Sequence, residues 1–176
     1  MQIHSVSRGD FTLASRKESS VYVDGRIATF AFRISYCIGQ LVWHEIQNLK
    51  IKAIGGPALG AIPIVISTLM ACYEHSYPVI NGFTVRSEIK KYGTQKRIEG
   101  VLPTAGSSVV IVDDTLTTGQ SLANAIQVVE QHGCRVENVI VLVDRQEGGK
   151  EFLEGKGYLV TSFLAMHANG ELRVVS

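Results

Sequence analysis

The chain has few cysteines, little net charge and no long uninterrupted apolar run, and each shortage excludes a class of protein. The three cysteines, Cys37, Cys72 and Cys134, are odd in number and lie in apolar stretches, which indicates buried free thiols rather than disulfides or a zinc site. A formal net charge of +1 provides no electrostatic attraction to nucleic acid or to an acidic membrane surface. We therefore expect a protein of the reducing cytoplasm that binds neither nucleic acid nor a membrane.

The sequence also lacks a targeting signal, a membrane span and a linker between domains. Its first ten residues contain no apolar core of the kind found in signal peptides. The apolar stretch around Ile62 to Cys72 is too short and too interrupted to span a bilayer. With 176 residues, 45% of them hydrophobic, the composition suits one domain with a sizeable core, and we expect residues 1–176 to form it.

The apolar pattern alternates between short strands and amphipathic helices. One helical stripe covers about six turns at 3.6 residues per turn. The predicted helices are Thr29–Leu49, Ile62–Tyr73, Gln120–His132 and Lys150–Glu154, and the predicted strands are Lys52–Gly55, Pro78–Val85, Ser108–Asp113, Val139–Asp144 and Tyr158–Met166. This order predicts an α/β fold with a doubly wound, mainly parallel sheet.

The stretch from Val109 to Leu122 carries the clearest chemical signal. Four β-favouring residues lead into Asp113 and Asp114, and a hydroxyl- and glycine-rich turn then continues to Gly119. Ligands of open α/β sheets bind at the carboxyl ends of strands, and backbone N–H groups at a helix N-terminus bind phosphate. Two acids would repel a phosphate alone, so the ligand must also offer ribose hydroxyls or a bound Mg²⁺. A solvated strand end with a capping acid is the alternative.

The polar segment from Arg86 to Gly100 is the second informative region. It contains two glycines and five cations, at positions 86, 90, 91, 96 and 97, without a sustained apolar period. Such a long polar segment without a predicted helix or strand is typical of a functional lid or of a solvated surface loop. Beside a phosphate-binding turn, the charge favours a mobile lid whose cations neutralise a departing anion.

Together these motifs resemble the type I phosphoribosyltransferases, and within them the orotate phosphoribosyltransferase family. In the family's phosphoribosyl pyrophosphate (PRPP) signature, two acids hold the ribose hydroxyls and the turn wraps the 5′-phosphate, as Asp113 and Asp114 with their turn would do. Arg86 to Gly93 resembles the catalytic loop Arg-Lys-Glu-x-Lys-x-His-Gly, with Ser87 replacing a lysine and Tyr92 the histidine. That loop reaches the neighbouring subunit's active site in the family, which implies a homodimer with shared active sites.

Three further segments extend the resemblance. Phe11 to Asp24 is similar to a hood over the base, here residues 1–26, with Tyr22 beside the ring and Ala14 replacing a lysine; core packing is the alternative for Tyr22. Gly55 to Ile64 resembles the pyrophosphate loop Gly-Pro-Ala-x-Lys-Gly-x-Pro, with Gly60 replacing its lysine. The sequence Asp-Arg-Gln-Glu after Val143 resembles the base-binding corner, in which Arg145 contacts the pyrimidine; a surface ion pair is the alternative.

The resemblance implies a pentosyl transfer from PRPP to orotate that yields orotidine 5′-monophosphate and pyrophosphate, with Mg²⁺ as cofactor. The implied catalytic residues are Lys90, Arg86, Asp113 and Asp114, without an assigned protein ligand for the metal. The implied PRPP-binding residues are Arg86, Lys90, Lys91, Tyr92, Asp113, Asp114, Thr115, Leu116, Thr117, Thr118, Gly119, Gln120 and Ser121. The implied base-binding residues are Thr117, Arg145 and Tyr22.

Two alternatives to this function follow from the residues. The missing lysines at Ala14, Gly60 and Ser87 leave open a related phosphoribosyltransferase that uses a purine or uracil. A regulator that senses PRPP or a nucleotide without catalysis is the other alternative. Such a sensor has no need of the loop cations Arg86 and Lys90, which therefore favour an enzyme.

Overall fold

A computed structural model of the protein describes residues 6–12, 18–87, 97–167 and 170–175. Its central feature is a seven-stranded sheet with the strand order β5-β4-β3-β6-β7-β8-β9. The five strands from β4 to β8 in this order are parallel, whereas β5 and β9 pair antiparallel at the two edges. The strands are β3 (Ala53–Pro57), β4 (Asn81–Val85), β5 (Ile98–Gly100), β6 (Ser108–Leu116), β7 (Arg135–Asp144), β8 (Val160–Met166) and β9 (Leu172–Val174).

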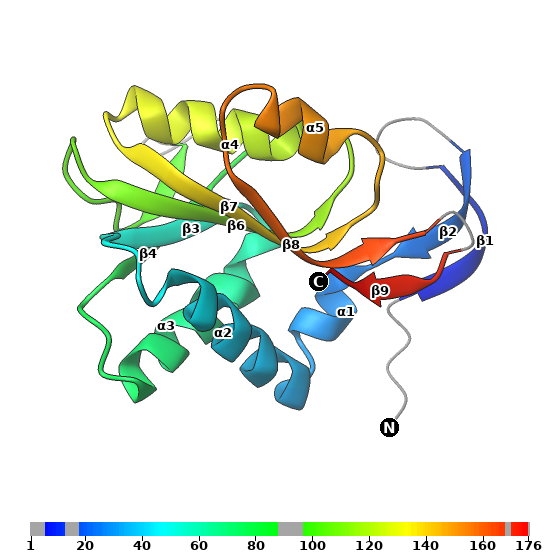
Figure 1. Ribbon diagram of the computed structural model, residues 1–176, viewed down its shortest axis with the longest axis horizontal. Helices are drawn as coiled ribbons and strands as arrows, with labels where there is room; N and C mark the ends of the chain where they lie inside the picture. The colour runs from blue at the N-terminus through cyan, green and yellow to red at the C-terminus, as the bar shows by residue number, and fades with distance from the viewer. Residues whose placement is uncertain (1–5, 13–17, 88–96, 168–169, 176) are drawn as a thin grey trace.

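Helices cover both faces of this sheet (Figure 1). One layer contains α2 (Phe32–Ile46) and α3 (Ala61–Glu74), and the opposite layer contains α4 (Gln120–Gln131) and α5 (Gly149–Glu154). Alternate residues of β6 enter different cores: Val109 and Ile111 pack with the core that includes α4, whereas Val110 and Val112 pack with α2 and α3. Because β6 is buried on both faces, its sequence is a continuous apolar run rather than an alternating one.

A separate two-stranded hairpin lies outside the main sheet. Its strands β1 (Val6–Thr12) and β2 (Glu18–Val23) pair antiparallel, with Ser7 opposite Tyr22. The short helix α1 (Gly25–Thr29) follows directly. Figure 1 shows the hairpin on the side of the molecule toward which β8 points. This hairpin comprises most of the segment predicted to form the hood.

The structure confirms the predicted α/β class and the mainly parallel sheet, but it corrects several boundaries. The helix predicted over Thr29–Leu49 is shorter: α2 begins at Phe32, because Ala31 before it has an extended backbone (φ −82°, ψ 123°), and α2 ends at Ile46. Phe30, an apolar residue at the start of the predicted helical stripe, precedes α2 and is 75% exposed. The predicted turn from Asp113 begins later, because β6 stays paired with β7 as far as Leu116.

Two edge strands were also missed. The end of the polar segment forms β5, which pairs with β4, and β9 follows the last predicted strand. Each has only three residues, too few to produce a recognisable period.

The cysteine prediction holds for two of the three residues. Cys72 and Cys134 are buried, and burial raises the pKa of Cys72 to about 11. Cys37 is exposed on α2, so the prediction of a buried thiol was wrong there. All three are free, as expected. None of the helices in the described part of the chain is both long and apolar enough to cross a membrane.

The central position of β6 makes its side chains a test of the core. Ile111 is fully buried, so Ile111→Ala should lower the free energy of unfolding by about 2–5 kcal/mol through lost burial and the cavity left behind. Urea denaturation measures this change. Val79→Ala is the control, since Val79 is 87% exposed and its truncation should change stability by less than about 0.5 kcal/mol. Equal effects of the two substitutions would contradict the assigned core.

Candidate active site

The strand order reverses direction between β3 and β6. The chain leaves β3 through α3 toward β4, whereas it leaves β6 through α4 toward β7 on the other side. The loops after these two neighbouring strands therefore diverge, and ligands of open α/β sheets bind at such a point. A Cβ atom at Gly60, after β3, would lie 2.5 Å from Asp113 Oδ1 and 2.6 Å from Asp114 Oδ1. The structure thus brings the predicted glycine loop against the predicted acid pair.

The acid pair is held by hydrogen bonds in a largely buried position. Asp113 is 8% exposed, and its Oδ1 accepts a hydrogen bond from the Asp114 backbone N–H at 3.0 Å. Thr115 Oγ1 donates to Asp114 Oδ1 at 3.3 Å. Burial, reinforced by repulsion from Asp114, raises the pKa of Asp113 well above its usual value, and burial also raises the pKa of Asp114. The pair is therefore suited to a ligand that supplies hydroxyl donors or positive charge.

The N-terminus of α1 packs against the second acid. A Cβ atom at Gly25 would lie 2.7 Å from Asp114 Oδ2. Asp24 accepts a hydrogen bond from the Arg26 backbone N–H and holds its guanidinium through Nε–Oδ1 and Nη2–Oδ2 contacts of 2.8 and 2.9 Å. Among the smaller influences on Asp114, the charge of Asp24 raises its pKa and that of Arg26 lowers it.

Sequence reasoning missed Asp24 and Arg26 as neighbours of the site. The available signal was an aspartate directly before a helix, which is a preferred N-cap residue. That signal predicts the cap but not its position beside Asp114, because the contact joins residues about ninety positions apart in the sequence.

The turn after β6 leads into an open helix N-terminus. Gly119 precedes α4 with φ +77°, and no side chain caps the helix there. A Cβ at Gly119 would lie 3.0 Å from the Gly149 carbonyl oxygen, so both backbone conformation and space favour glycine. The first N–H groups of α4 can therefore bind an anion, as predicted for the 5′-phosphate. Leu116, also predicted for PRPP binding, has its side chain in the core, at 1% exposed.

The corner after β7 lies against this turn. The Arg145 backbone N–H donates to the Leu116 carbonyl at 2.9 Å, and a Cβ at Gly149 would collide with the Thr117 carbonyl oxygen. The Arg145 side chain is 4% exposed, and its Nε lies 3.0 Å from Glu147 Oε1. An ion pair is thus present, but it is buried, unlike the surface pair considered from the sequence.

Comparison with known proteins identifies the family. A model of the phosphoribosyl transferase domain matches residues 47–156. The chain is 37% identical over 174 residues to the orotate phosphoribosyltransferase of Synechocystis sp., covering 98% of this chain and 84% of that protein. It is 39% identical over 158 residues to that of Methanosphaera stadtmanae, covering 90% and 85%. This chain belongs to the orotate phosphoribosyltransferase family.

Solved structures of similar proteins agree with this assignment. A phosphoribosyltransferase from Corynebacterium diphtheriae has a TM-score of 0.80 and 32% identity, covering 95% of this chain and 92% of that one. The Mycobacterium tuberculosis orotate phosphoribosyltransferase in complex with PRPP has a TM-score of 0.69 and 33% identity, covering 84% and 82%. The fold expected from the family resemblance is therefore confirmed.

The ends of the predicted family loop are held together. The Arg86 backbone N–H donates to the Arg97 carbonyl at 2.8 Å, and the Arg97 guanidinium donates to the Arg86 carbonyl at 3.3 Å. Arg86 Nη1 lies 3.3 Å from Glu99 Oε1, with both side chains 41% exposed. Lys90, Lys91 and Tyr92 lie outside the described residues, as does the side chain of Tyr22.

The residues also limit how this family member could hold Mg²⁺. Among the residues that the structure describes, no three histidines, cysteines or acids form a metal-binding group. The acid pair offers two adjacent carboxylates, and Mg²⁺ is often bound by one or two carboxylates with substrate phosphates and water. The site therefore fits an ion carried largely by the substrate.

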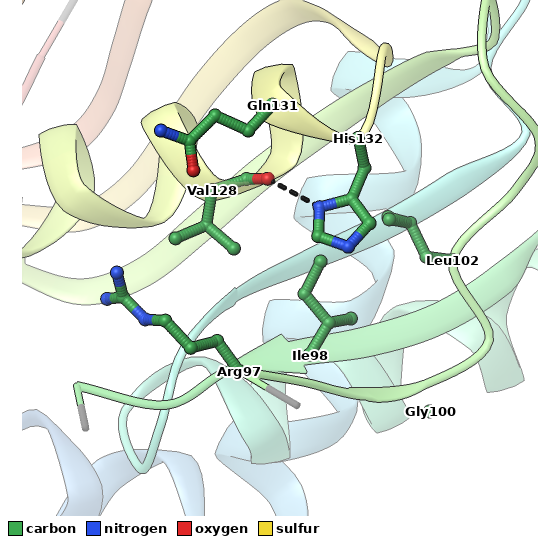
Figure 2. A pocket seen from close by; sticks show the side chains of 7 residues that line it. All are labelled: Arg97, Ile98, Gly100, Leu102, Val128, Gln131 and His132. Carbon is green, nitrogen blue, oxygen red and sulfur yellow. Dashed lines mark hydrogen bonds between the residues drawn. The ribbon is translucent and has the colours of Figure 1, made fainter. Parts of the chain in front are cut away.

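A separate cavity of about 540 Å³ lies between β5 and the second half of α4 (Figure 2). His132 Nδ1 donates to the Val128 carbonyl at 2.8 Å beside it. None of the predicted catalytic or substrate-binding residues lines this cavity, so it is distinct from the site at the acid pair. Its lining residues are Arg97, Ile98, Gly100, Leu102, Val128, Gln131 and His132.

The raised pKa of Asp113 predicts a stability cost at neutral pH. The unfolded chain loses this proton near its ordinary pKa of 3.8, whereas the folded protein keeps it to higher pH. The free energy of unfolding should therefore fall as pH rises through that interval and then level off. Asp113→Asn should be about 0.5–2 kcal/mol more stable at pH 7, measured by urea denaturation between pH 4 and 8.

The exposed carboxylate of Glu151 provides the control for this measurement. Glu151→Gln should leave the dependence of stability on pH unchanged. If Asp113→Asn kept the slope of the unsubstituted protein, Asp113 would not have the raised pKa assigned to it.

Proposed function

We propose that this chain transfers the 5-phosphoribosyl group from PRPP to orotate, releasing pyrophosphate and forming orotidine 5′-monophosphate in pyrimidine biosynthesis. The observation that carries this proposal is the acid pair at the end of β6, next to β3 and shortly before a helix that begins after Gly119, in a member of this family. The three free cysteines support a reducing cytoplasm as its location.

The acid pair and the turn would bind the ribose phosphate of PRPP. Asp113 and Asp114 accept hydrogen bonds from the ribose hydroxyls, and their negative charge lies near the sugar as positive charge develops at C1′. The helix N-terminus binds the 5′-phosphate through backbone N–H groups and nearby hydroxyls. The residues assigned to this binding are Thr115, Leu116, Thr117, Thr118, Gly119, Gln120 and Ser121.

The basic loop would stabilise the leaving group. The C1′–oxygen bond breaks with its electron pair going to pyrophosphate, while a ring nitrogen of the base attacks C1′. Arg86, Lys90, Lys91 and Tyr92 are assigned to the diphosphate. Arg86 can leave Glu99 and bind the diphosphate instead, because an ion pair as exposed as this one contributes little to stability. Bound Mg²⁺ would add positive charge at the pyrophosphate, with Asp113 and Asp114 as the described carboxylates able to hold it.

The corner beside the turn would bind orotate. Arg145 offers a planar set of donors suited to an anionic base with carbonyl oxygens, and Thr117 and Tyr22 are assigned to the same ring. The backbone hydrogen bond from Arg145 to Leu116, and the packing of Gly149 against the Thr117 carbonyl, support a base site next to the phosphate site. This arrangement favours orotate over a purine.

A substrate assay tests the proposal directly. With PRPP and Mg²⁺, we expect turnover of orotate and little turnover of uracil, adenine or hypoxanthine. Asp114→Asn should lower kcat by about 10²-fold, because it removes charge beside the developing cation. Glu151→Gln is the control and should retain activity. Purine turnover without orotate turnover would overturn the assigned substrate.

An apolar surface on α2 and α3 supports the homodimer. Phe32 is 90% exposed, Tyr73 is 83% exposed, and Tyr36, Ile66 and Met70 are each more than half exposed. Monomeric proteins rarely expose so many large apolar side chains together. A second copy of this chain would cover them, and the loop 86–100 would then reach the neighbouring active site.

Substitution on this surface tests the dimer. Phe32→Arg should shift the protein toward a monomer in light scattering, because it places a charge in the interface. Val79→Arg, at a similarly exposed residue outside the two helices, should remain dimeric. A Phe32→Arg protein that stays fully dimeric would place the interface elsewhere.

Mixing two inactive variants tests whether the active sites are shared. A dimer of one Lys90→Ala chain and one Asp114→Asn chain has one intact site only if Lys90 acts across the interface. Random exchange of subunits should therefore restore about a quarter of full activity. No recovery would place the loop in its own subunit's site.

A further inference from the structure

An ion pair holds the side chain of Arg86 at the start of the loop 86–100. Arg86 Nη1 lies 3.3 Å from Glu99 Oε1, and both side chains are 41% exposed. The two residues come from neighbouring antiparallel strands, because Arg86 directly follows β4 and Glu99 lies in β5 opposite Thr84. The contact joins one nitrogen to one oxygen at a long distance, whereas an arginine can bind a carboxylate through two short parallel bonds. It is therefore a weak pair.

This pair leaves donors of the guanidinium unused. The Nε atom of Arg86 is buried and has no hydrogen-bond partner among the described residues. A guanidinium carries several N–H donors and no acceptor. A diphosphate offers acceptor oxygens for more of these donors than the single carboxylate oxygen of Glu99 does. Glu99 thus holds Arg86 in an arrangement that a diphosphate improves upon.

Arg86 also lies beside the glycine-rich loop that resembles the family's pyrophosphate loop. In this loop, the Ala58 backbone N–H donates to the carbonyl of Val85, the neighbour of Arg86, at 2.9 Å. A small cavity of about 50 Å³ is lined by Arg86 together with Pro57 and Ala58 of the loop and Ser121 in the first turn of α4. The arginine that contacts the carboxylate is therefore also next to the loop at which a diphosphate is expected.

We infer that Glu99 is a positioning residue that competes with pyrophosphate for the Arg86 guanidinium and so limits how tightly the enzyme holds this product. The inference rests on the proposed function, because it places pyrophosphate at Arg86. The carboxylate and the diphosphate are both anions that accept from the same donors, so each weakens the binding of the other. When pyrophosphate leaves, the return of Arg86 to Glu99 recovers part of the lost interaction and favours release.

Titration with inorganic pyrophosphate tests this competition. Glu99→Gln removes the competing charge at nearly the same side-chain volume. The dissociation constant for pyrophosphate, measured by calorimetry with Mg²⁺, should therefore fall by about twofold to fivefold, and KM for PRPP should fall with it. A purely structural role for Glu99 predicts the opposite, because a loosened β5 would weaken binding. Unchanged or weaker binding by Glu99→Gln would overturn the inference.

A second background separates the contact with Arg86 from general repulsion. The charge of Glu99 would also repel a diphosphate without any help from Arg86. In an Arg86→Gln protein, the further substitution Glu99→Gln should change the affinity by less than about 1.5-fold, because the contact is already lost. An undiminished gain in that background would mean that Glu99 acts only through its charge, against the inference.

A matched control removes another exposed, paired carboxylate. Glu171 Oε2 lies 2.9 Å from Arg173 Nη2 beside β9, at the opposite edge of the sheet. Glu171→Gln should therefore leave the affinity for pyrophosphate unchanged.

The inference and the assigned substrate fail separately, because pyrophosphate binding does not depend on which base is used. A protein that shows the expected pyrophosphate affinities but turns over a purine instead of orotate would contradict the proposed substrate and support the role of Glu99. A protein that turns over orotate but whose pyrophosphate affinity ignores Glu99→Gln would support the proposed function and overturn the inference.

Discussion

The burial of two adjacent carboxylates is the constraint on which this site depends. Asp113 and Asp114 are adjacent in the chain, and loss of contact with water raises the pKa of both; the charge of Asp114 raises the pKa of Asp113 further. Glycines pack against these carboxylates. Gly25 and Gly60 lie so near that a Cβ atom at either position would be too close to a carboxylate oxygen. The glycine at position 60 is therefore part of the packing around the acids and not simply a lost lysine.

The strand that carries the two acids is itself buried. β6 is buried on both faces as far as Val112, and its ladder with β7 continues past both acids to Leu116. A rigid strand can hold two repelling groups in place, whereas a loop would let them separate. Burying the Asp113 carboxyl group lowers the stability of the fold, and the apolar core around β6 offsets this cost, a common arrangement at functional sites.

Much of this arrangement was predictable from local patterns. The apolar run before Asp113 indicated a buried strand, and Gly119 with the periodic residues after it indicated a helix start. Contacts between distant segments were not predictable, because strand order decides them. Thus the approach of Gly60 to Asp113, and of Asp24 and Arg26 to Asp114, required the structure. The extended backbone at Ala31 was missed because apolar residues lie on both sides of it.

The edges of the sheet also determine how copies of this chain can meet. An open parallel sheet with long edge strands invites further strands to pair along it and so to aggregate. Here the sheet ends in β5 and β9, each of three residues and each reversed in direction. Such short ends offer few backbone groups to an incoming strand. Growth of the sheet from chain to chain is thereby discouraged, and self-association is left to the side chains on its helical face.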